Sequence, residues 1–257
     1  MRTALCISGH LRTFDRTFLS LYKNIIKPNN CDVFIHTWET LGYTGPVDGT
    51  AQAYDTERRK ENILSMYQPK KIVIENSNGF QQFRQMGEGY NDRYMKVHPG
   101  YMFAMFYSLW QANLLKTQYE NENNFVYDCV IRCRPDLMFE TGIDIKRFVV
   151  SNPLDAIYVP NFGFYSGVND QFAFSNSRMM NIYSELYNMI HTHCRRGCEF
   201  RPEPMLAFHL NHHRLPVKRC SIRYNILRFT GRLVVQQENS QQDIIDNPYN
   251  LKNHNFS

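Results

Sequence analysis

The stretch YDCVIRCRPDL, residues 127–137, decides the fold class of this chain. Val130 and Ile131 predict the interior of a buried strand, and Pro135 ends that strand and turns the chain outward. Asp136 follows at once. Because open α/β sheets bind their ligands at the carboxyl ends of buried strands, this carboxylate occupies a position typical of a ligand site.

Two arginines, Arg132 and Arg134, accompany that carboxylate. A guanidinium group left unpaired in an apolar core costs several kcal/mol, so both groups need a partner. One interpretation is an anion bound together with a cation, as in a phosphate with its metal ion. The other is a structural Arg–Asp ion pair at a strand end, and these residues alone leave both open.

Composition favours one α/β domain with a sizeable core. The chain has 257 residues, of which 43% are hydrophobic. Its net charge of +5, from 29 basic and 24 acidic residues, is spread along the sequence, which favours anionic ligands slightly and argues against a nucleic-acid partner. Aromatic residues make up 14%, which suits a site that stacks flat rings or sugars as well as a packed core.

Seven cysteines form no dense framework, which indicates free thiols in a reducing compartment. His191, His193, Cys194 and Cys198 have the residue types of a zinc site, but the spacing HTHCRRGC matches no common zinc pattern. The first residues lack the apolar core of a signal peptide, and no run of about 18 apolar residues occurs. We therefore expect a soluble, cytoplasmic protein with no transmembrane segment.

Strand-like and helix-like segments alternate along the chain. The expected strands are 4–9, 32–38, 70–76, 127–133, 156–160 and 171–175, and the expected helices are 13–26, 55–66, 101–120, 177–190 and 201–213. This order predicts a Rossmann-type mixed sheet, mostly parallel, with helices on both faces. Glycine-rich residues 39–54 and 77–100 are expected to be loops, and 236–257 a polar tail.

Polar groups cluster where these strands end or begin, at residues 9–12, 36–38, 132–136 and 169–171. In a parallel sheet with helical crossovers, the first three segments lie at the same edge, where nucleotides bind. We expect one site to unite them.

Five motifs together resemble a known family. They are Ser8-Gly9-x-x-Arg12, DVFIHTW at 32–38, the opening stretch at 127–137, NDQFAF at 169–174 and PExxL at 202–206. As a set they are similar to a group of nucleotide-sugar glycosyltransferases of the GT-A fold, found among surface-glycan genes of bacteria and large DNA viruses. The resemblance spans roughly residues 3–230.

The resemblance implies a GT-A-like catalytic domain over residues 1–235. Its nucleotide-binding half would be about 1–137 and its acceptor half 138–235, with 236–257 as the tail. Such an enzyme moves a sugar from a UDP-, GDP- or dTDP-sugar to a glycan hydroxyl. A GT-A-like module that binds nucleotide or glycan without catalysis is the alternative.

The family's Asp-x-Asp pair holds a divalent ion on the donor diphosphate. Here the first carboxylate is replaced by Arg134, so the resemblance implies Mn²⁺ or Mg²⁺ on Asp136 with a later residue such as His209 or His212. Alternatively Arg134 and its neighbour Arg132 neutralise the diphosphate directly, because guanidinium groups pair with phosphate in a bidentate manner.

Roles for the other residues follow from the same resemblance and from their chemistry. The expected donor- and nucleotide-binding residues are Ser8, Gly9, Arg12, His36, Thr37, Trp38, Arg132, Arg134, Asp136, Asn169 and Gln171, with residues 36–38 lining the base or ribose site. Asp170 is expected either to contact the donor sugar or to act as catalytic base, and Glu203 competes for the role of base, because an acceptor hydroxyl needs one carboxylate within hydrogen-bond reach. For Glu203 the first turn of a helix offers a purely structural role as well. A nucleotidyltransferase or methyltransferase is a third reading, which the lack of a glycine-rich phosphate loop disfavours.

Overall fold

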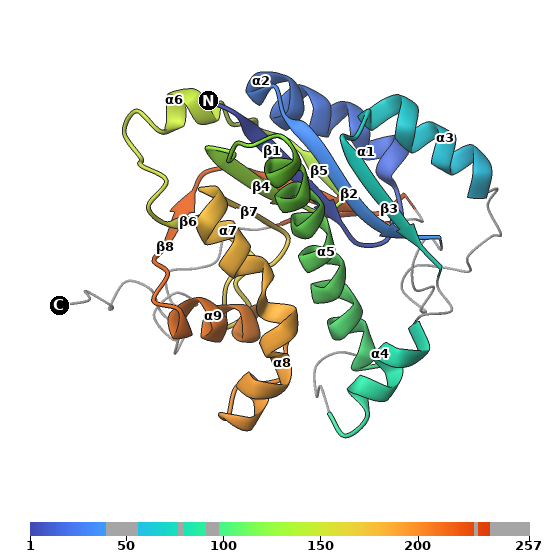
Figure 1. The fold of residues 1–257 in the computed structure, drawn as a ribbon, viewed down its shortest axis with the longest axis vertical. Helices are drawn as coiled ribbons and strands as arrows, with labels where there is room; N and C mark the ends of the chain where they lie inside the picture. The colour runs from blue at the N-terminus through green and yellow to red at the C-terminus, as the bar shows by residue number, and fades with distance from the viewer. Residues whose placement is uncertain (40–55, 77–79, 91–97, 229–230, 237–257) are drawn as a thin grey trace.

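The computed structural model describes residues 1–39, 56–76, 80–90, 98–228 and 231–236. It is built around a seven-stranded sheet in the order β3-β2-β1-β4-β7-β6-β8, beside a three-stranded sheet in the order β10-β9-β5 (Figure 1). The strands are β1 Thr3–Ser8, β2 Asp32–Trp38, β3 Lys71–Glu75, β4 Cys129–Cys133, β5 Leu137–Phe139, β6 Ile157–Pro160, β7 Phe172–Ser175, β8 Val217–Cys220, β9 Tyr224–Leu227 and β10 Leu233–Val234. The expected loop at 39–54 lies, from residue 40 on, outside the described residues, as does nearly all of the tail.

Helices connect most of these strands. They are α1 Phe14–Leu21, the π-helical turn η1 Tyr22–Ile26, α2 Lys27–Asn29, α3 Thr56–Tyr67, α4 Phe80–Gly87, α5 Gly100–Glu122, α6 Ile145–Phe148, α7 Ser177–Ser184, α8 Leu186–Arg195 and α9 Pro202–His212. The predicted α/β class is confirmed.

The large sheet is mixed and mostly parallel, as expected. β1 pairs parallel with β2 and β4, β2 with β3, and β6 with β8. Only β7 is reversed, running antiparallel to β4 and β6. Because β7 runs backwards, its first residues lie beside the last residues of β4, and this places two segments that are far apart in sequence at one edge.

The sheet separates two hydrophobic cores, as the side chains of β1 show. Ala4 and Cys6 belong to the core under α5, α7, α8 and α9, whereas Leu5 and Ile7 belong to the core under α1 and α3. Both faces are therefore covered by helices, which explains why the strands are continuous apolar runs.

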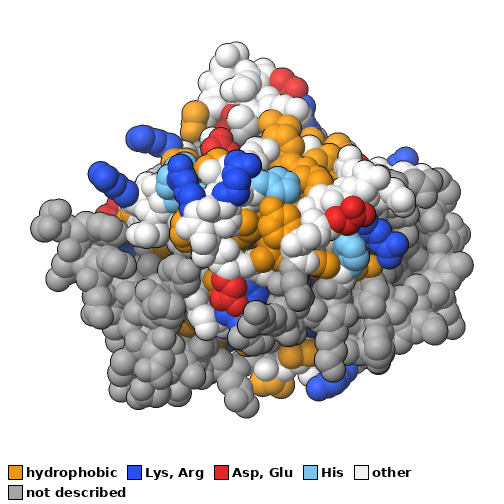
Figure 2. Space-filling view, turned by 90° about the horizontal axis from the view of Figure 1, so that it is seen from below, with side chains coloured by type: hydrophobic (Ala, Val, Ile, Leu, Met, Phe, Trp, Pro, Cys, Tyr) orange, Lys and Arg blue, Asp and Glu red, His pale blue; other side chains and the backbone are white. Residues whose placement is uncertain are grey.

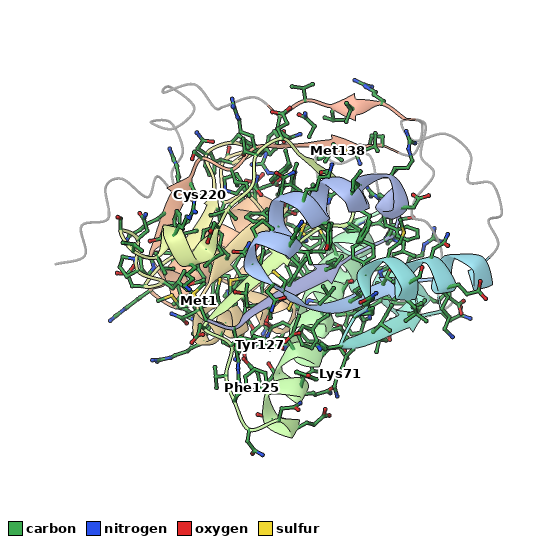
Figure 3. The ribbon with its side chains drawn as sticks, turned by 90° about the horizontal axis from the view of Figure 1, so that it is seen from above. Met1, Lys71, Phe125, Tyr127, Met138 and Cys220 are labelled. Carbon is green, nitrogen blue, oxygen red and sulfur yellow. The ribbon has the colours of Figure 1, made fainter. Side chains whose placement is uncertain are left out.

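The two outer strands of the sheet are marked in Figure 3 by Lys71 of β3 and Cys220 of β8, which lie on opposite sides of the molecule. The chain start packs near the entrance to β4, where the Arg2 guanidinium lies 4.3 Å from the ring centre of Phe125. Tyr127 then donates from its hydroxyl to Asp32 Oδ2 at 2.8 Å and joins β4 to β2. These contacts lie at the edge where the parallel strands begin. The polar groups lie at the opposite edge, where the strands end.

Several elements differ from the sequence predictions. The helix expected at 177–190 is two helices, and segment 77–100, expected as a loop, contains α4. Two of its glycines serve helix packing: a Cβ added to Gly87 would lie 2.4 Å from Gly100 N, so α4 and α5 meet through these two residues. The small sheet was not predicted, because β5 has three residues and pairs with β9, some 85 positions away.

Candidate active site

Four polar segments converge at the carboxyl edge of the parallel strands. Ser8 at the end of β1 is paired with His36 of β2, and β4 ends on the other side of β1. The entrance of β7 meets the end of β4, where Arg134 N donates to Gln171 O at 3.2 Å. The expected meeting of these segments at one edge is confirmed.

Asp136 lies at this edge, and two guanidinium groups enclose it. Its side chain is 1% exposed. Oδ1 accepts from Arg134 Nε at 2.9 Å, and Oδ2 accepts from Arg134 Nη2 at 2.6 Å and from Arg12 Nη1 at 3.0 Å. Burial alone would raise the pKa of Asp136, but the charges of Arg134 and Arg12 outweigh it and hold that pKa well below its usual range. The carboxylate is ionised, and protein donors occupy both of its oxygens.

The donor atoms here do not fit the divalent ion that the resemblance implied. A metal ion needs the carboxylate lone pairs that Arg12 and Arg134 already occupy, and these cations would repel it. His209 does not present a free ligand atom either, because its Nδ1 lies 3.0 Å from His193 Nε2 and its Nε2 donates to Ile182 O at 2.7 Å. Within the described residues, no three His, Cys, Asp or Glu side chains group as a metal site.

Arg132 differs from Arg12 and Arg134 because no described carboxylate pairs with it. It is 3% exposed, its Nη1 donates to Gln171 O at 2.9 Å, and its Nε has no hydrogen-bond partner. Unlike Arg12 and Arg134, it forms no ion pair with a carboxylate in the part of the chain that the structure describes. A buried cation in this state is costly, so an anion at this position would lower the electrostatic free energy of the site.

Unsatisfied polar atoms accompany this guanidinium. Oε1 of Gln171 and the hydroxyl of Tyr183 are buried without a hydrogen-bond partner in the described part of the chain. Burial raises the pKa of Tyr183, and the nearby charge of Arg132 opposes that rise. Tyr183 therefore remains a hydroxyl donor beside the cation, which is a second group able to bind an anion.

Two residues of the turn at 169–171 have different roles: Asn169 is structural, and the Asp170 carboxylate has no partner among the described residues. Asn169 was expected to bind the donor, but its Oδ1 accepts from Gln171 N at 2.9 Å and from Tyr224 OH at 3.2 Å, and its Nδ2 donates to Phe162 O at 3.0 Å. Its polar atoms thus fix the turn. Asp170 is 5% exposed and makes no hydrogen bond or ion pair with any described residue, although its charge raises the pKa of Arg134 alongside that of Asp136.

The turn after β1 approaches the same edge. Gly9 has φ +111°, a conformation that side chains disfavour, and a Cβ there would meet no atom within 4 Å. The open space above Gly9 and the unpartnered Oγ of Ser8 are consistent with a ligand that contacts this turn. Arg12, with φ +45°, ends the turn and reaches Asp136.

His36, Thr37 and Trp38 were expected to line a base or ribose site, and the structure places them beneath it instead. They are 0%, 1% and 2% exposed. Thr37 Oγ1 donates to Gly9 O at 2.8 Å, and the Trp38 ring packs against Phe83 and His36. Both faces of β2 are buried, so these side chains lie in the protein interior. There they support the Gly9 turn.

A Ser–His–Glu cluster lies under the same turn, and its geometry excludes nucleophilic catalysis. His36 Nδ1 lies 2.9 Å from Ser108 Oγ, and His36 Nε2 lies 3.1 Å from Glu75 Oε1. Ser108 is fully buried; its Oγ accepts from Gly9 N at 2.8 Å and lies 3.2 Å from the His36 carbonyl oxygen. A hydroxyl engaged in this way cannot reach a substrate, so the cluster positions Gly9.

Glu203 stands in the first turn of α9 and contacts the loop that leads to Asp170. Val168 N donates to Glu203 O at 3.0 Å, and a Cβ at Gly167 would lie 2.0 Å from Glu203 backbone atoms. Only glycine allows this close approach. Glu203 is half-buried beside that loop, so it and Asp170 both remain candidates for the base.

The histidines of α8 and α9 form a neutral, hydrogen-bonded cluster. Burial lowers the pKa of His193 to about 4 and that of His209 to about 3. The ring of His212 faces the Arg196 guanidinium at 3.3 Å, which disfavours a metal ion there. Burial also raises the pKa of Cys198 to about 12, which disfavours the thiolate that zinc requires.

Ser108, Glu75 and Tyr183 were missed by the sequence analysis. Ser108 and Tyr183 lie within helices whose apolar spacing indicated core packing. Glu75 could have been found, because it ends a predicted strand and so obeys the same rule that identified the other polar segments. Tertiary packing alone unites these three with the site.

Comparisons with known proteins add a remote structural likeness. No family model matches the sequence, and no curated protein matches it. Among solved structures, the apo crystal structure of mouse xyloside xylosyltransferase 1 is similar over 85% of this chain and 84% of that chain, with 10% identity and a TM-score of 0.45. That degree of similarity says nothing about substrates or residue roles. In the described residues, the helices are too short or too polar to cross a membrane.

Proposed function

We propose that this protein is a glycosyltransferase that moves a sugar from a nucleoside-diphosphate donor to a hydroxyl of a glycan acceptor. One observation carries the proposal: the buried guanidinium of Arg132 has no counter-ion among the described residues, at the edge of an α/β sheet where nucleotides bind. The motif resemblance names the family whose ligand would supply that anion.

The diphosphate would bind where the positive charge exceeds the negative charge. Arg12, Arg132 and Arg134 face two carboxylates, Asp136 and Asp170, so the edge carries a surplus of positive charge. Guanidinium groups bind phosphate oxygens through paired N–H donors, and they stabilise the charge that develops on a departing nucleoside diphosphate. Here they would neutralise the diphosphate in place of the divalent ion, while Asp136 fixes the orientation of Arg12 and Arg134.

The acceptor hydroxyl needs a base, and Asp170 is the stronger candidate. It has no partner among the described residues and is held close to the cluster by the 169–171 turn. Glu203 is the alternative, held near the same loop. The enclosed carboxylate of Asp136 also suits the second candidate function, a module that binds nucleotide or glycan without turnover.

A thermal-shift screen of UDP, GDP and dTDP, in EDTA and in Mn²⁺, tests the proposal. We expect at least one nucleotide to raise the melting temperature in EDTA, and the matching nucleotide sugar to be slowly hydrolysed. Arg132→Met should remove the shift, and Arg147→Met, the same change at an exposed arginine of α6, should leave it intact. Binding without any sugar release supports the binding module, and no nucleotide binding in either buffer refutes the donor site.

Asp170→Asn and Glu203→Gln then separate the two bases. The variant that loses sugar transfer while keeping the nucleotide shift identifies the base, because an amide retains the size of the side chain but not its basicity. Full transfer activity in both variants would contradict the assignment.

A further inference from the structure

A strip of half-exposed aromatic side chains lies outside the anion site. Tyr107 and Trp110 of α5 lie on one helix face with Gln111 and Leu114, at the spacing i, i+3, i+4, i+7, and all four are half-exposed. Tyr187 of α8 joins them: its ring stacks on Trp110 with centroids 5.7 Å apart and planes at 23°, and it lies 5.2 Å from Tyr107. We call Tyr107, Trp110 and Tyr187 the aromatic strip.

The strip belongs to the helical layer on one face of the sheet. Figure 2 views the molecule from the side of α4 and α8 and shows hydrophobic side chains exposed as a band across it. α5 and α8 are in contact, so the three rings form one continuous surface. Aromatic surface left partly in water at adjacent positions of two helices is available to a ligand.

A carboxylate ends the strip and decides what kind of ligand fits. Glu75 Oε1 accepts from Tyr107 OH at 2.8 Å and from the His36 ring at 3.1 Å, and its second oxygen has no partner among the described residues. Its side chain is 30% exposed. The hydrogen bond from His36 outweighs burial and lowers the pKa of Glu75, with further help from Tyr107, so the group remains an acceptor.

This combination selects among ligand classes. An anion would be repelled by Glu75, and a wholly apolar partner would bury an ionised oxygen without a hydrogen bond, which is costly. A neutral pyranose satisfies both parts, because one face of the ring carries C–H groups that pack on aromatic rings while its hydroxyls donate to a carboxylate. We propose that the aromatic strip and Glu75 bind a neutral pyranose unit of the acceptor glycan.

The assignment to the acceptor rests on the proposed function, and the connection through His36 supports it. Glu75 is hydrogen-bonded to His36, which is hydrogen-bonded to Ser108, which holds Gly9 N at the anion site. A sugar at Glu75 is therefore next to the turn that would hold the donor, and the strip extends away from it along α5. That direction suits a chain of sugars, whose reacting end lies at the anion site.

Tryptophan emission gives a direct test, because the chain has two tryptophans and Trp38 is 2% exposed. We would titrate the protein, without nucleotide, with lactose, cellobiose, maltose and diacetylchitobiose, and with glucuronate and 1-hexanol as anionic and apolar comparisons. At least one disaccharide should change the emission saturably, and glucuronate and hexanol should not. No saturable change with any of the four sugars, or an equal change with hexanol, overturns the proposal.

Variants locate the binding by saturation-transfer NMR with the disaccharide that responds. Trp110→Leu should weaken binding by about tenfold or more, because it removes the aromatic face. Glu75→Gln keeps one oxygen for Tyr107 and His36 but loses the free carboxylate oxygen, and it should weaken binding as well. Tyr22→Ala removes an aromatic ring that is 39% exposed elsewhere and should bind as wild type does. Unchanged binding in Trp110→Leu refutes the site even if Glu75→Gln fails to fold.

The outcome is separable from that of the proposed function, because the sugar titration contains no nucleotide. Sugar binding at Trp110 without nucleotide binding upholds the strip and favours a glycan-binding module. Nucleotide binding and donor hydrolysis without any sugar response uphold the donor site and refute the strip.

Discussion

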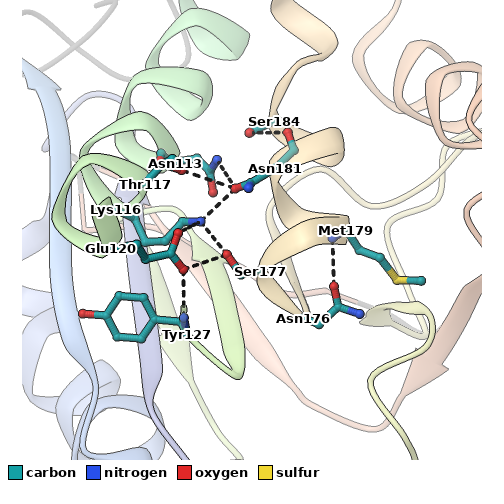
Figure 4. Close-up of polar contacts among 10 residues, drawn as sticks. All are labelled: Asn113, Lys116, Thr117, Glu120, Tyr127, Asn176, Ser177, Met179, Asn181 and Ser184. Carbon is teal, nitrogen blue, oxygen red and sulfur yellow. Dashed lines mark hydrogen bonds and ion pairs between the residues drawn. The ribbon is translucent and has the colours of Figure 1, made fainter. Parts of the chain in front are cut away.

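Two buried cations of this protein, Lys116 and Arg132, have opposite surroundings. Lys116 is fully buried in α5, and its Nζ donates to Glu120 at 2.9 Å, to Ser177 at 2.7 Å and to Asn181 at 2.8 Å, as Figure 4 shows. All three of its protons have acceptors. Arg132, almost as deeply buried, makes one side-chain hydrogen bond and no ion pair within the part of the chain that the structure describes.

The difference separates structural charge from functional charge. The Lys116 cluster connects α5 to α7 and also holds β4, because Glu120 Oε1 accepts from Tyr127 N at 2.8 Å. A satisfied network of this kind contributes to the uniqueness of the fold. Arg132 has no comparable set of partners, so we infer that its partner is a ligand. Four predictions test this contrast, beginning with the largest expected effect.

Lys116→Met should lower the free energy of unfolding by about 3–5 kcal/mol, because it leaves the buried Glu120 carboxylate without its cation. Urea denaturation measures this change. Lys218→Met, which breaks an exposed pair with Asp155, serves as the control and should cost less than about 1 kcal/mol. A Lys116 variant as stable as that control would show that the network is not structural.

Asp136→Asn should lower the free energy of unfolding by about 2 kcal/mol, less than for Lys116, because Arg12 and Arg134 are partly exposed and regain some water. It should also tighten nucleotide binding in EDTA, since it removes negative charge beside two guanidinium groups. A metal-ligand role for Asp136 predicts the reverse, namely binding in Mn²⁺ that the variant loses. Thermal shifts in the two buffers distinguish these outcomes.

Acid should destabilise the protein in two steps. His193 and His209 have folded pKa values of about 4 and about 3, below the unfolded value of about 6.5, so protons bind the unfolded chain first and stability falls as pH drops below about 6.5. The depressed pKa of Asp136 adds a second loss below about pH 4. The first step should amount to roughly 1–2 kcal/mol by about pH 6.

Urea denaturation from pH 7.5 to 4.5 measures the first step. His212, His213 and Arg196 add positive charge around His193, and Glu185 opposes it at His213. His193→Gln retains a donor for His209 and should flatten the slope, whereas His191→Gln, at an exposed position of the same helix, should not. Equal slopes in wild type and His193→Gln would show that these histidines do not control the acid sensitivity.

Arg132→Met should change the free energy of unfolding least, by about 0 to 1 kcal/mol, and in the stabilising direction, because it removes an uncompensated buried charge. The same variant should lose the nucleotide-induced thermal shift. A gain in stability together with a loss of nucleotide binding would distinguish Arg132 most clearly from Lys116, whose loss lowers stability. A marked loss of stability would instead make Arg132 a structural residue.

The sequence predicted the sheet and the edge that carries the site. It did not predict which polar residues face a ligand and which support the fold. Apolar runs ending in Ser8-Gly9, Trp38 and Arg134 were enough to place three strand ends together. The strand periodicity did not show that His36 and Trp38 point into the core, because both faces of that strand are buried and its apolar run is unbroken. Nor did the sequence show that the ligand atoms of Asp136 and His209 are engaged by Arg12 and His193, because those contacts form only when separate elements pack together.

The sequence by itself determined the α/β class, the mostly parallel sheet and the meeting of polar segments at its carboxyl edge. These follow from local periodicity and from the rule that parallel strands end at one level. Only the tertiary structure decided which charges are compensated. Asp136 pairs with Arg12, 124 residues away, as well as with its neighbour Arg134; Lys116 pairs with Glu120 of its own helix and donates to Ser177 and Asn181 of α7; Arg132 pairs with none of the described carboxylates. Charge compensation depends on distances of a few ångströms between remote parts of the chain, which packing alone sets.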